Sequence, residues 1–511
     1  MNLLFSLQKV SLDEQINQSF DNATRWFVDA VMWQIPITKD VGLPWVLIIL
    51  IAGATYFTLY FKAINIRGFW TSIQVVRGKY DEIENGYVPT NASRRLDMPD
   101  TIRNESEEGE VSHFQALTAA LSATVGLGNI AGVAIALSIG GPGATFWMIV
   151  VGLLGMSSKF VECTLGVKYR EVDSNGTVFG GPMYYLSKGL AAKGFKQIGK
   201  ALAVLFAIMC IGGSFGGGNM FQVNQAFKLF EHVTGAEQSW FYGKGWLFGL
   251  IMSVLVGIVI IGGIKKIATV TDKIVPAMVV MYVLAVLTVI GLNYEAIPNA
   301  IASIWNGAFS PEGVTGGFIG VMIQGFRRGA FSNEAGIGSA SIAHSAVKTK
   351  YPASEGLVAL LEPFIDTVLV CTMTALALII TDTLVVGAVL NDEQGVLLTA
   401  SALESGISWF PYLLSFAVIL FAFSSMISWS YYGYQSWSYL FGRSKKAEYT
   451  YKILFCVFVI IGGAASLGAV IGFSDAMVFA MMVPNMIGLI ILAPKVGEEL
   501  RKYMKVIKRS A

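Results

Sequence analysis

The sequence predicts an all-α polytopic membrane protein with about eleven transmembrane helices. One extra N-terminal helix is expected to precede a 5+5 inverted-repeat core that contains two broken helices. Three observations support this fold class. The 511 residues are 54% hydrophobic and only 14% charged, with a mean hydropathy of +0.61, which is more apolar surface than a water-soluble fold needs. Basic residues alternate between successive loops, and glycine-rich stretches interrupt the first apolar segment of each half.

Residues 1–42 precede the first apolar segment and are expected on the extracytoplasmic side. The opening apolar run is too short for a signal peptide. From Phe20 to Met32, hydrophobic residues recur at helical spacing beside acidic residues, which predicts an amphipathic helix at the membrane surface. The extra transmembrane helix is expected at 43–61, followed by a cytoplasmic connecting segment at 62–112 with room for a short surface helix.

The inverted-repeat core is expected at 113–495, ahead of a basic cytoplasmic tail at 496–511. Ten apolar segments long enough to span a bilayer follow one another within it. They lie at 114–138, 143–167, 198–230, 246–263, 273–292, 314–346, 355–382, 408–440, 450–470 and 474–494. Each half then contains five spans, and because five is odd, the two halves cross the membrane with opposite topology.

Lysine and arginine residues in the loops predict the orientation of these spans. Nearly all loop cations fall on one side, which includes the connecting segment, the loop around Lys188 and the tail. The opposite side carries only Lys9, Arg25, Lys39 and Lys244. We therefore expect the N-terminus outside and the C-terminus in the cytoplasm.

The first apolar segment of the core is interrupted at mid-membrane depth by Ser122-Ala-Thr-Val-Gly-Leu-Gly-Asn-Ile-Ala-Gly132. Its three glycines weaken the helix, and a freed backbone group in hydrocarbon needs a partner or a water-filled cavity. The helix is therefore expected to break around 124–128. Unwound carbonyls suit a cation or an ammonium group, and the N–H groups of the next half-helix suit a carboxylate, so an amino acid with a sodium ion would satisfy both. The alternative is that the glycines allow close helix packing.

A second glycine-rich stretch, Gln324-Gly-Phe-Arg-Arg-Gly-Ala-Phe-Ser-Asn-Glu-Ala-Gly-Ile-Gly338, lies in the first helix of the second half. Interrupted helices at corresponding positions of two inverted repeats are typical of the substrate site of secondary transporters. The cysteines all lie in apolar segments and the histidines share no ligand spacing, so we expect no disulfide, no enzyme, no organic cofactor and no nucleic-acid partner. A channel assembled from several chains stays open as an alternative, as does the oligomeric state.

Several short motifs resemble those of the alanine/glycine:cation symporters, within the amino acid–polyamine–organocation superfamily. Gly140-Gly-Pro-Gly-Ala-Thr-Phe-Trp-Met148, continuing to Gly155, is similar to the signature of that family, and the stretches 128–132, 180–186 and 331–336 resemble it too. The resemblance covers about residues 43–495, and the preceding residues look like an addition. It implies a bacterial or archaeal inner-membrane protein that imports alanine or glycine with sodium, on the broken-helix fold of the neurotransmitter:sodium symporters.

The resemblance also implies specific ion and substrate ligands. The first sodium site would use the carbonyls of Ser122, Val125 and Phe421 and the hydroxyls of Ser424 and Ser425, uncharged oxygens that suit a hard cation. A second sodium site would use Thr124 and the Asn129 side chain. The substrate carboxylate would lie near the amides of Gly126 and Gly128, and Thr124 is expected to contact the substrate as well.

Two further stretches are expected to complete the substrate site. Asn219 and Gln222 follow clustered glycines in the third core helix, and their amides contact either the substrate or a neighbouring helix. Trp429 lies one helical turn after the serine pair, on the same face of its helix, where it would limit the substrate to a small side chain. The alternative is a lipid-facing or interfacial tryptophan. Gly325 and Phe326 are expected in the same wall.

Arg327 and Arg328 are costly inside a membrane and are expected to pair with acidic residues. The candidate partners are Glu334, Glu362 and Asp366. Glu362 and Asp366, four residues apart, either relay protons or hold the cytoplasmic half together through an arginine. The first possibility leads to an alternative function, a proton-coupled amino-acid symporter that uses membrane carboxylates.

Overall fold

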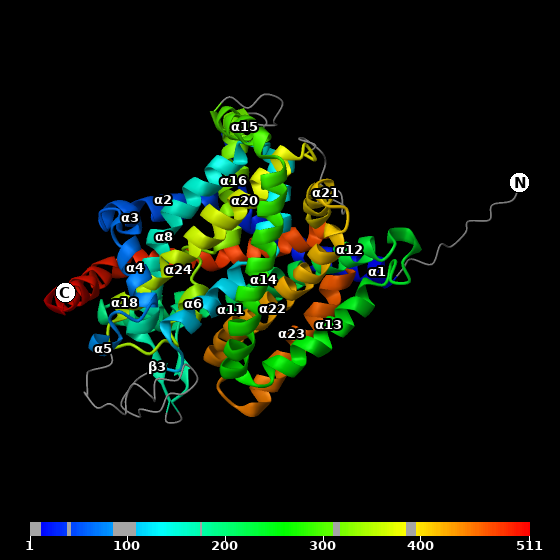
Figure 1. Cartoon of the computed structure of the whole chain (residues 1–511). Coiled ribbons are helices and arrows are strands. Elements are labelled where there is room, and N and C mark those ends of the chain that lie inside the picture. Colours follow the sequence, from blue (N-terminus) through cyan, green and yellow to red (C-terminus); the bar gives the residue numbers. More distant parts are fainter. Residues whose placement is uncertain are drawn as a thin grey trace, which may run out of the picture.

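The computed structural model describes residues 12–37, 42–84, 109–173, 176–309, 317–384 and 395–510. Within these ranges the protein is a bundle of helices with two short β-hairpins (Figure 1). Each hairpin connects two consecutive helices and pairs its strands antiparallel. The pairs are β1 (Gln34–Pro36) with β2 (Gly42–Pro44), and β3 (Glu171–Val172) with β4 (Val178–Phe179).

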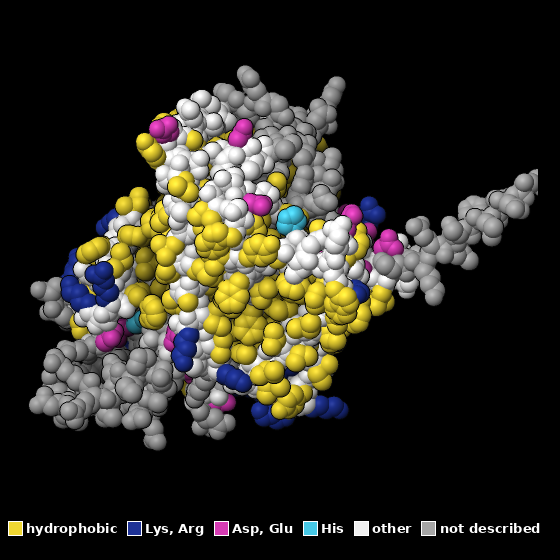
Figure 2. All heavy atoms as spheres, turned by 45° about the vertical axis from the view of Figure 1, so that its right-hand side comes forward, with side chains coloured by type: hydrophobic (Ala, Val, Ile, Leu, Met, Phe, Trp, Pro, Cys, Tyr) yellow, Lys and Arg dark blue, Asp and Glu magenta, His cyan; other side chains and the backbone are white. Residues whose placement is uncertain are grey.

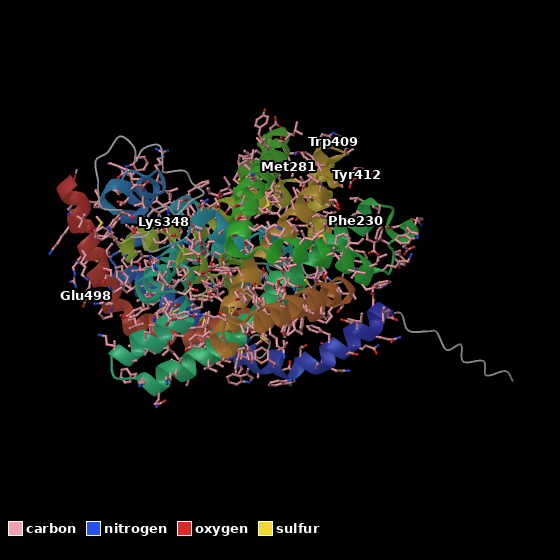
Figure 3. The ribbon with its side chains drawn as sticks, turned by 90° about the horizontal axis from the view of Figure 1, so that it is seen from below. Phe230, Met281, Lys348, Trp409, Tyr412 and Glu498 are labelled. Atoms are coloured by element: carbon pink, nitrogen blue, oxygen red, sulfur yellow. The ribbon has the colours of Figure 1, made fainter. Side chains whose placement is uncertain are left out.

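The N-terminal helices pack on the outside of the core. They are α1 (Leu12–Val31), α2 (Trp45–Tyr60), α3 (Ile64–Arg67), α4 (Phe69–Val76) and α5 (Asp81–Glu84). α1 buries Phe20, whose ring lies 5.1 Å from that of Phe473 in α24, while Trp26 is exposed on its other side. Figure 3 shows α1, in dark blue, running beside α23, in orange-brown. Residues 1–11 and 85–108 of the predicted N-terminal and connecting segments lie outside the described residues.

Every span that we expect in the first half of the core coincides with one helix or with consecutive helices. The elements of this half are α6 (His113–Thr124), η2 (Gly128–Gly132), α7 (Val133–Gly140), α8 (Ala144–Tyr169), α9 (Pro182–Tyr184), η3 (Tyr185–Gly189), α10 (Leu190–Ala192), α11 (Lys196–Phe215), η4 (Gly216–Met220), α12 (Phe221–Val233), η5 (Ala236–Gln238), α13 (Gly245–Ile260) and α14 (Gly263–Leu292). The π-helical turns η2 and η4 each lie in a glycine-rich stretch.

The second half follows the same plan, with helices α15 and α21 added in loops between expected spans. Its elements are η6 (Tyr294–Ala296), α15 (Ile297–Phe309), α16 (Gly317–Asn333), α17 (Ala340–His344), α18 (Pro352–Ala359), α19 (Leu361–Pro363), η7 (Phe364–Cys371), α20 (Thr372–Ile380), α21 (Val396–Gly406), α22 (Phe410–Phe441), α23 (Lys445–Ala464) and α24 (Leu467–Ser510).

Both expected helix breaks are present. α6 ends at Thr124, Val125 has extended backbone (φ −75°, ψ 91°), and the helix resumes at Gly128 with a bend of 52°. In the second half, α16 ends at Asn333, and Glu334 then has the left-handed φ of +54°. The prediction of two broken helices is therefore confirmed, although the second break lies near the end of its predicted stretch.

The lengths and surfaces of the helices agree with a membrane protein. Among the described residues, seven helices are long and apolar enough to cross a membrane, the bent pair around the first break would be an eighth, and α2 and α13 are shorter apolar helices. Figure 2 shows hydrophobic side chains gathered across one face, with Lys and Arg side chains at its lower edge. In Figure 3, Lys348 and Glu498 lie on one side of the view, and Phe230 and Tyr412 on the other.

Candidate functional site

A small cavity lined by buried residues lies where the two helix breaks meet. The space between its lining atoms, including solvent at its open side, is about 290 Å³. The first break, the second break, the glycine-rich turn η4 with α12, and helices α22 and α24 all contribute to its wall. The lining residues are Ala123, Thr124, Gly128, Gly217, Gln222, Phe331, Ser332, Glu334, Trp429 and Val478. The inverted repeat therefore brings its two irregular segments to one place.

Four of the expected substrate residues line this cavity: Thr124, Gly128, Gln222 and Trp429. Gly126 lies directly beside it, and its N–H donates to the Asn129 Oδ1 at 2.8 Å. The neighbouring Leu127 N–H donates to Gln222 Oε1 at 3.3 Å. Two amides of the break are thus already bonded to side chains of the protein.

The other expected substrate residues lie elsewhere. Asn219 turns away from the cavity and donates to the Phe455 carbonyl of α23 at 2.8 Å, which is the interhelical alternative. Gly325 and Phe326 lie within continuous α16, against α8. A Cβ on Gly325 would be 2.5 Å from the Ala144 carbonyl oxygen, and the Phe326 ring is 5.4 Å from that of Trp147. The second break contributes Phe331, Ser332 and Glu334 to the cavity instead.

Trp429 fixes the width of the cavity on one side. Its side chain is only 2% exposed, so the alternative of a lipid-facing tryptophan is wrong. The indole lies directly over Gly218, where a Cβ would be 2.3 Å from Trp429 Cγ. A glycine at this position is what lets the indole pack so closely, and a larger residue would displace the Trp429 ring.

The residues expected for the first sodium ion form one hydrogen-bonded cluster between α6 and α22. The Ser425 hydroxyl donates to the Ser122 carbonyl at 3.0 Å, and the Ser122 hydroxyl donates to the Ser424 carbonyl at 3.0 Å. The Ser424 hydroxyl donates to the Phe421 carbonyl at 3.0 Å. Val125, the remaining expected ligand, is the first residue after α6. Carbonyl and hydroxyl oxygens from two helices are thus gathered beside the first break.

Asn129 connects the first break to a buried carboxylate. Its amide nitrogen lies 2.6 Å from Asp366 Oδ1 in η7 and 3.2 Å from the Ser332 hydroxyl. Ser332 and Thr367 donate to Asp366 Oδ2 at 2.8 and 2.7 Å. Asp366 is completely buried. The arginine partner that the sequence predicts for Asp366 is wrong, since its contacts are the neutral side chains of Asn129, Ser332 and Thr367. Burying a carboxylate inside a membrane is energetically costly, and such residues usually belong to a functional site.

The arginine pair has a different partner from those expected. Arg327 and Arg328 both contact the Asp475 carboxylate of α24, with Arg327 Nη2 at 2.7 Å. Glu334 and Asp366 therefore have no arginine partner within the described ranges. Glu362 pairs instead with Lys159 Nζ at 2.7 Å, while the Glu162 carboxylate is 3.9 Å from the same lysine. Asp475 reaches the two arginines through tertiary packing, because α24 is remote from α16 in sequence but lies next to it in the fold.

The protein is similar to several transporters. It is 41% identical to the sodium/alanine symporter AgcS of Methanococcus maripaludis over 410 residues, which are 80% of this chain and 88% of that protein. It is 32% identical to the probable sodium/glutamine symporter GlnT of Bacillus subtilis over 462 residues, 90% of this chain and 87% of that protein. The crystal structure of MhsT in complex with L-phenylalanine has a TM-score of 0.55 at 16% identity, covering 75% of this chain and 89% of that one, which supports the fold alone.

The family match is broader than the motifs indicate. It runs over residues 28–511 and so begins inside α1 and includes the basic tail. Most of the residues that precede 43 and looked like an addition still lie outside it. Together with the relatives above, this match makes the protein a multi-pass membrane transporter and not an enzyme. The chain belongs to the sodium:alanine symporter family.

Proposed function

We propose that this protein is a sodium-coupled importer of small neutral amino acids, alanine or glycine, working by alternating access. The observation that carries the proposal is that both helix breaks open on one small cavity, beside two clusters of oxygen ligands. The similarity to AgcS, a sodium/alanine symporter, supports both the substrate and the ion. GlnT is a probable sodium/glutamine symporter, and glutamine has a larger side chain than alanine, so the size of the accepted substrate side chain needs a test.

The dimensions of the cavity favour a substrate with a small side chain. Trp429 fills one side, held by its close packing on Gly218. Phe331 and Val478 add further apolar bulk. A methyl group or a hydrogen suits this wall better than a carboxamide chain. The substrate carboxylate would lie at Gly128, where the second half-helix begins and its N–H groups carry positive character.

Sodium would bind at the two oxygen clusters. The Ser122–Ser425 cluster provides carbonyls and hydroxyls without formal charge, a donor set that suits a hard monovalent cation. The Asp366 cluster adds a carboxylate to the Asn129 and Ser332 side chains. It extends the second sodium site that the resemblance implies, in which Thr124 and Asn129 were the named ligands.

Asn129 supports a direct coupling between ion and substrate. Its side chain accepts from the Gly126 amide of the break and donates to Asp366. A cation at Asp366 would order Asn129 and through it the unwound backbone that binds the substrate. Substrate binding would then cost less, and by reciprocity the substrate would raise the affinity for sodium.

We also propose that the N-terminus lies outside and the C-terminus in the cytoplasm of a bacterial or archaeal cell. The distribution of loop cations supports this orientation. The positions of Lys348 and Glu498 on one side of Figure 3 agree with it, since both belong to segments expected in the cytoplasm.

The test is uptake of labelled alanine into proteoliposomes under an inward sodium gradient or an inward proton gradient. Wild-type uptake should saturate and need sodium. Ser425→Ala should reduce it about tenfold or more, because it removes one ion ligand. Ser430→Ala is the matched control, since that hydroxyl donates within its own helix to the Ile427 carbonyl at 2.6 Å. Uptake driven equally by protons would favour the proton-coupled alternative, and absence of alanine uptake would contradict the substrate.

A further inference from the structure

Glu334 is the single charged residue among the ten that line the cavity. Its side chain is 5% exposed. The carboxylate accepts from the Trp429 indole N–H at 3.2 Å and from the Ser339 hydroxyl at 2.5 Å. Both donors are neutral. The described part of the chain contains no Lys, Arg or His that forms an ion pair with Glu334.

Two other buried carboxylates, Glu362 and Asp475, each contact a cation of the protein. Glu362 has Lys159 at 2.7 Å, and Asp475 has both Arg327 and Arg328. The base that could otherwise serve Glu334, Lys159, is thus engaged elsewhere. A buried carboxylate with neutral donors alone lacks the compensation that makes burial of a charge tolerable. A cation from outside the protein would supply it.

The backbone at Glu334 also points to a role for its side chain. Glu334 has φ of +54°, a conformation in which a side chain is strained and glycine is favoured. The same break uses glycine at Gly336 and Gly338, where φ is +82° and +101°. Retaining a glutamate at such a position aims its carboxylate into the cavity at a conformational cost, as functional residues do.

We propose that Glu334 binds the α-ammonium group of the substrate. The ammonium provides both the missing positive charge and N–H donors, and such charge-assisted hydrogen bonds are among the strongest. Trp429 and Ser339 hold the carboxylate in position. The inference rests on the proposed function, because it assigns one end of the amino acid, while Gly128 receives the carboxylate. It defines the substrate class: small amino acids with a free amino group.

The experiment measures ligand binding rather than transport. Purified wild-type protein, Glu334→Gln and the control Glu171→Gln, a surface carboxylate, are tested for binding of ³H-alanine at saturating sodium and of ²²Na without substrate. Glu334→Gln should weaken alanine binding at least about 30-fold and leave ²²Na binding and the thermal midpoint unchanged. Glu171→Gln should change neither. On wild-type protein, propionate and N-acetylalanine, which lack a free amino group, should not compete with alanine.

Each other outcome separates the alternatives. Unchanged alanine affinity in Glu334→Gln overturns the proposal, and loss of ²²Na binding there would place Glu334 in the ion site. Unchanged affinity together with a lost pH dependence of uptake would make Glu334 a proton carrier. Competition by propionate overturns the proposal even if the variant fails to fold. Absence of alanine binding in the wild type would instead reject the substrate, and the same comparison would be repeated with the amino acid that binds.

Discussion

Two buried groups of charges lie close together in this protein and are built differently. The first, called here the charged network, consists of Glu84, His113, Glu355, His344, Glu362 and Lys159. The second, called here the cavity carboxylates, consists of Glu334, which lines the cavity, and Asp366, which accepts from the lining residue Ser332. In the network, every acid contacts a base. Among the residues that the structure describes, the cavity carboxylates contact hydroxyl, amide and indole donors only.

The network connects helices that are far apart in sequence. His113, the first residue of α6, lies 2.8 Å from the Glu84 carboxylate and also contacts Glu355. His344 joins Glu355 to Glu362, with a distance of 2.6 Å to Glu362. Since it neutralises itself, the network stabilises the packing of α5, α6, α17, α18, α19 and α8 without any ligand. The cavity carboxylates, by contrast, leave negative charge for cations that arrive from outside.

Breaking the network should give the largest loss of stability. Lys159→Met leaves Glu362 and Glu162 with less positive charge in a fully buried position, and loss of one partner of a buried pair costs about 3–5 kcal/mol. The thermal midpoint of the purified protein should fall accordingly. The double variant Lys159→Met/Glu362→Leu should recover much of this loss, because it replaces the pair by apolar groups.

Ligand binding distinguishes a structural network from a functional one. In a folded Lys159→Met/Glu362→Leu protein, the affinities for alanine and sodium should remain close to those of the wild type. A well-folded double variant that no longer binds alanine would show that the network acts on the cavity. The division into a structural network and functional cavity carboxylates would then be wrong.

Asp366→Asn should show the opposite emphasis, a large loss of ion binding with a smaller loss of stability than Lys159→Met. Asparagine keeps the size of the side chain and one oxygen for Ser332 and Thr367, but it removes the charge and the oxygen that accepts from Asn129. Sodium affinity should fall by about 30-fold to 1,000-fold, as for loss of one member of a buried charge pair. The measurement is ²²Na binding, with the thermal midpoint as the control for folding. Unchanged sodium binding would remove Asp366 from the ion site.

The fold and the first break could be predicted because their signals are local. Glycines at Gly126 and Gly128, with polar neighbours, weaken a helix wherever it packs, and the break at Thr124 follows from them. The second break was predicted over a wide stretch. Its position at Glu334 depends on a left-handed residue that is not glycine, so no sequence signal marks it. For this reason Gly325 and Phe326 were assigned to a wall that Phe331 and Ser332 provide.

Helix faces and long-range partners were harder to predict. The π-helical turn η4 at Gly216–Met220 adds residues to one turn, so the ordinary 3.6-residue period does not carry across it. Asn219 lies within this turn and bonds to α23, whereas Gln222, just beyond it, reaches the cavity. The partner of the arginine pair, Asp475, lies nearly 150 residues away, and only the packing of α24 on α16 brings them together.

The smallest effect is expected at the exposed ion pairs, which can be compared with the buried pairs of the charged network. Glu171 of β3 contacts Lys188 at 3.0 Å and Arg443 at 2.8 Å, all three being about 40% exposed. Burial raises the pKa of Glu171, but the hydrogen bonds and charges of these two cations outweigh it and hold the pKa below 4.5. The stabilisation is therefore present at neutral pH and lost as the pH falls through the lowered pKa. Glu171→Gln should cost less than about 1 kcal/mol, with the difference in thermal midpoint disappearing in acid. A loss as large as that of Lys159→Met would mean that burial does not set the strength of these pairs.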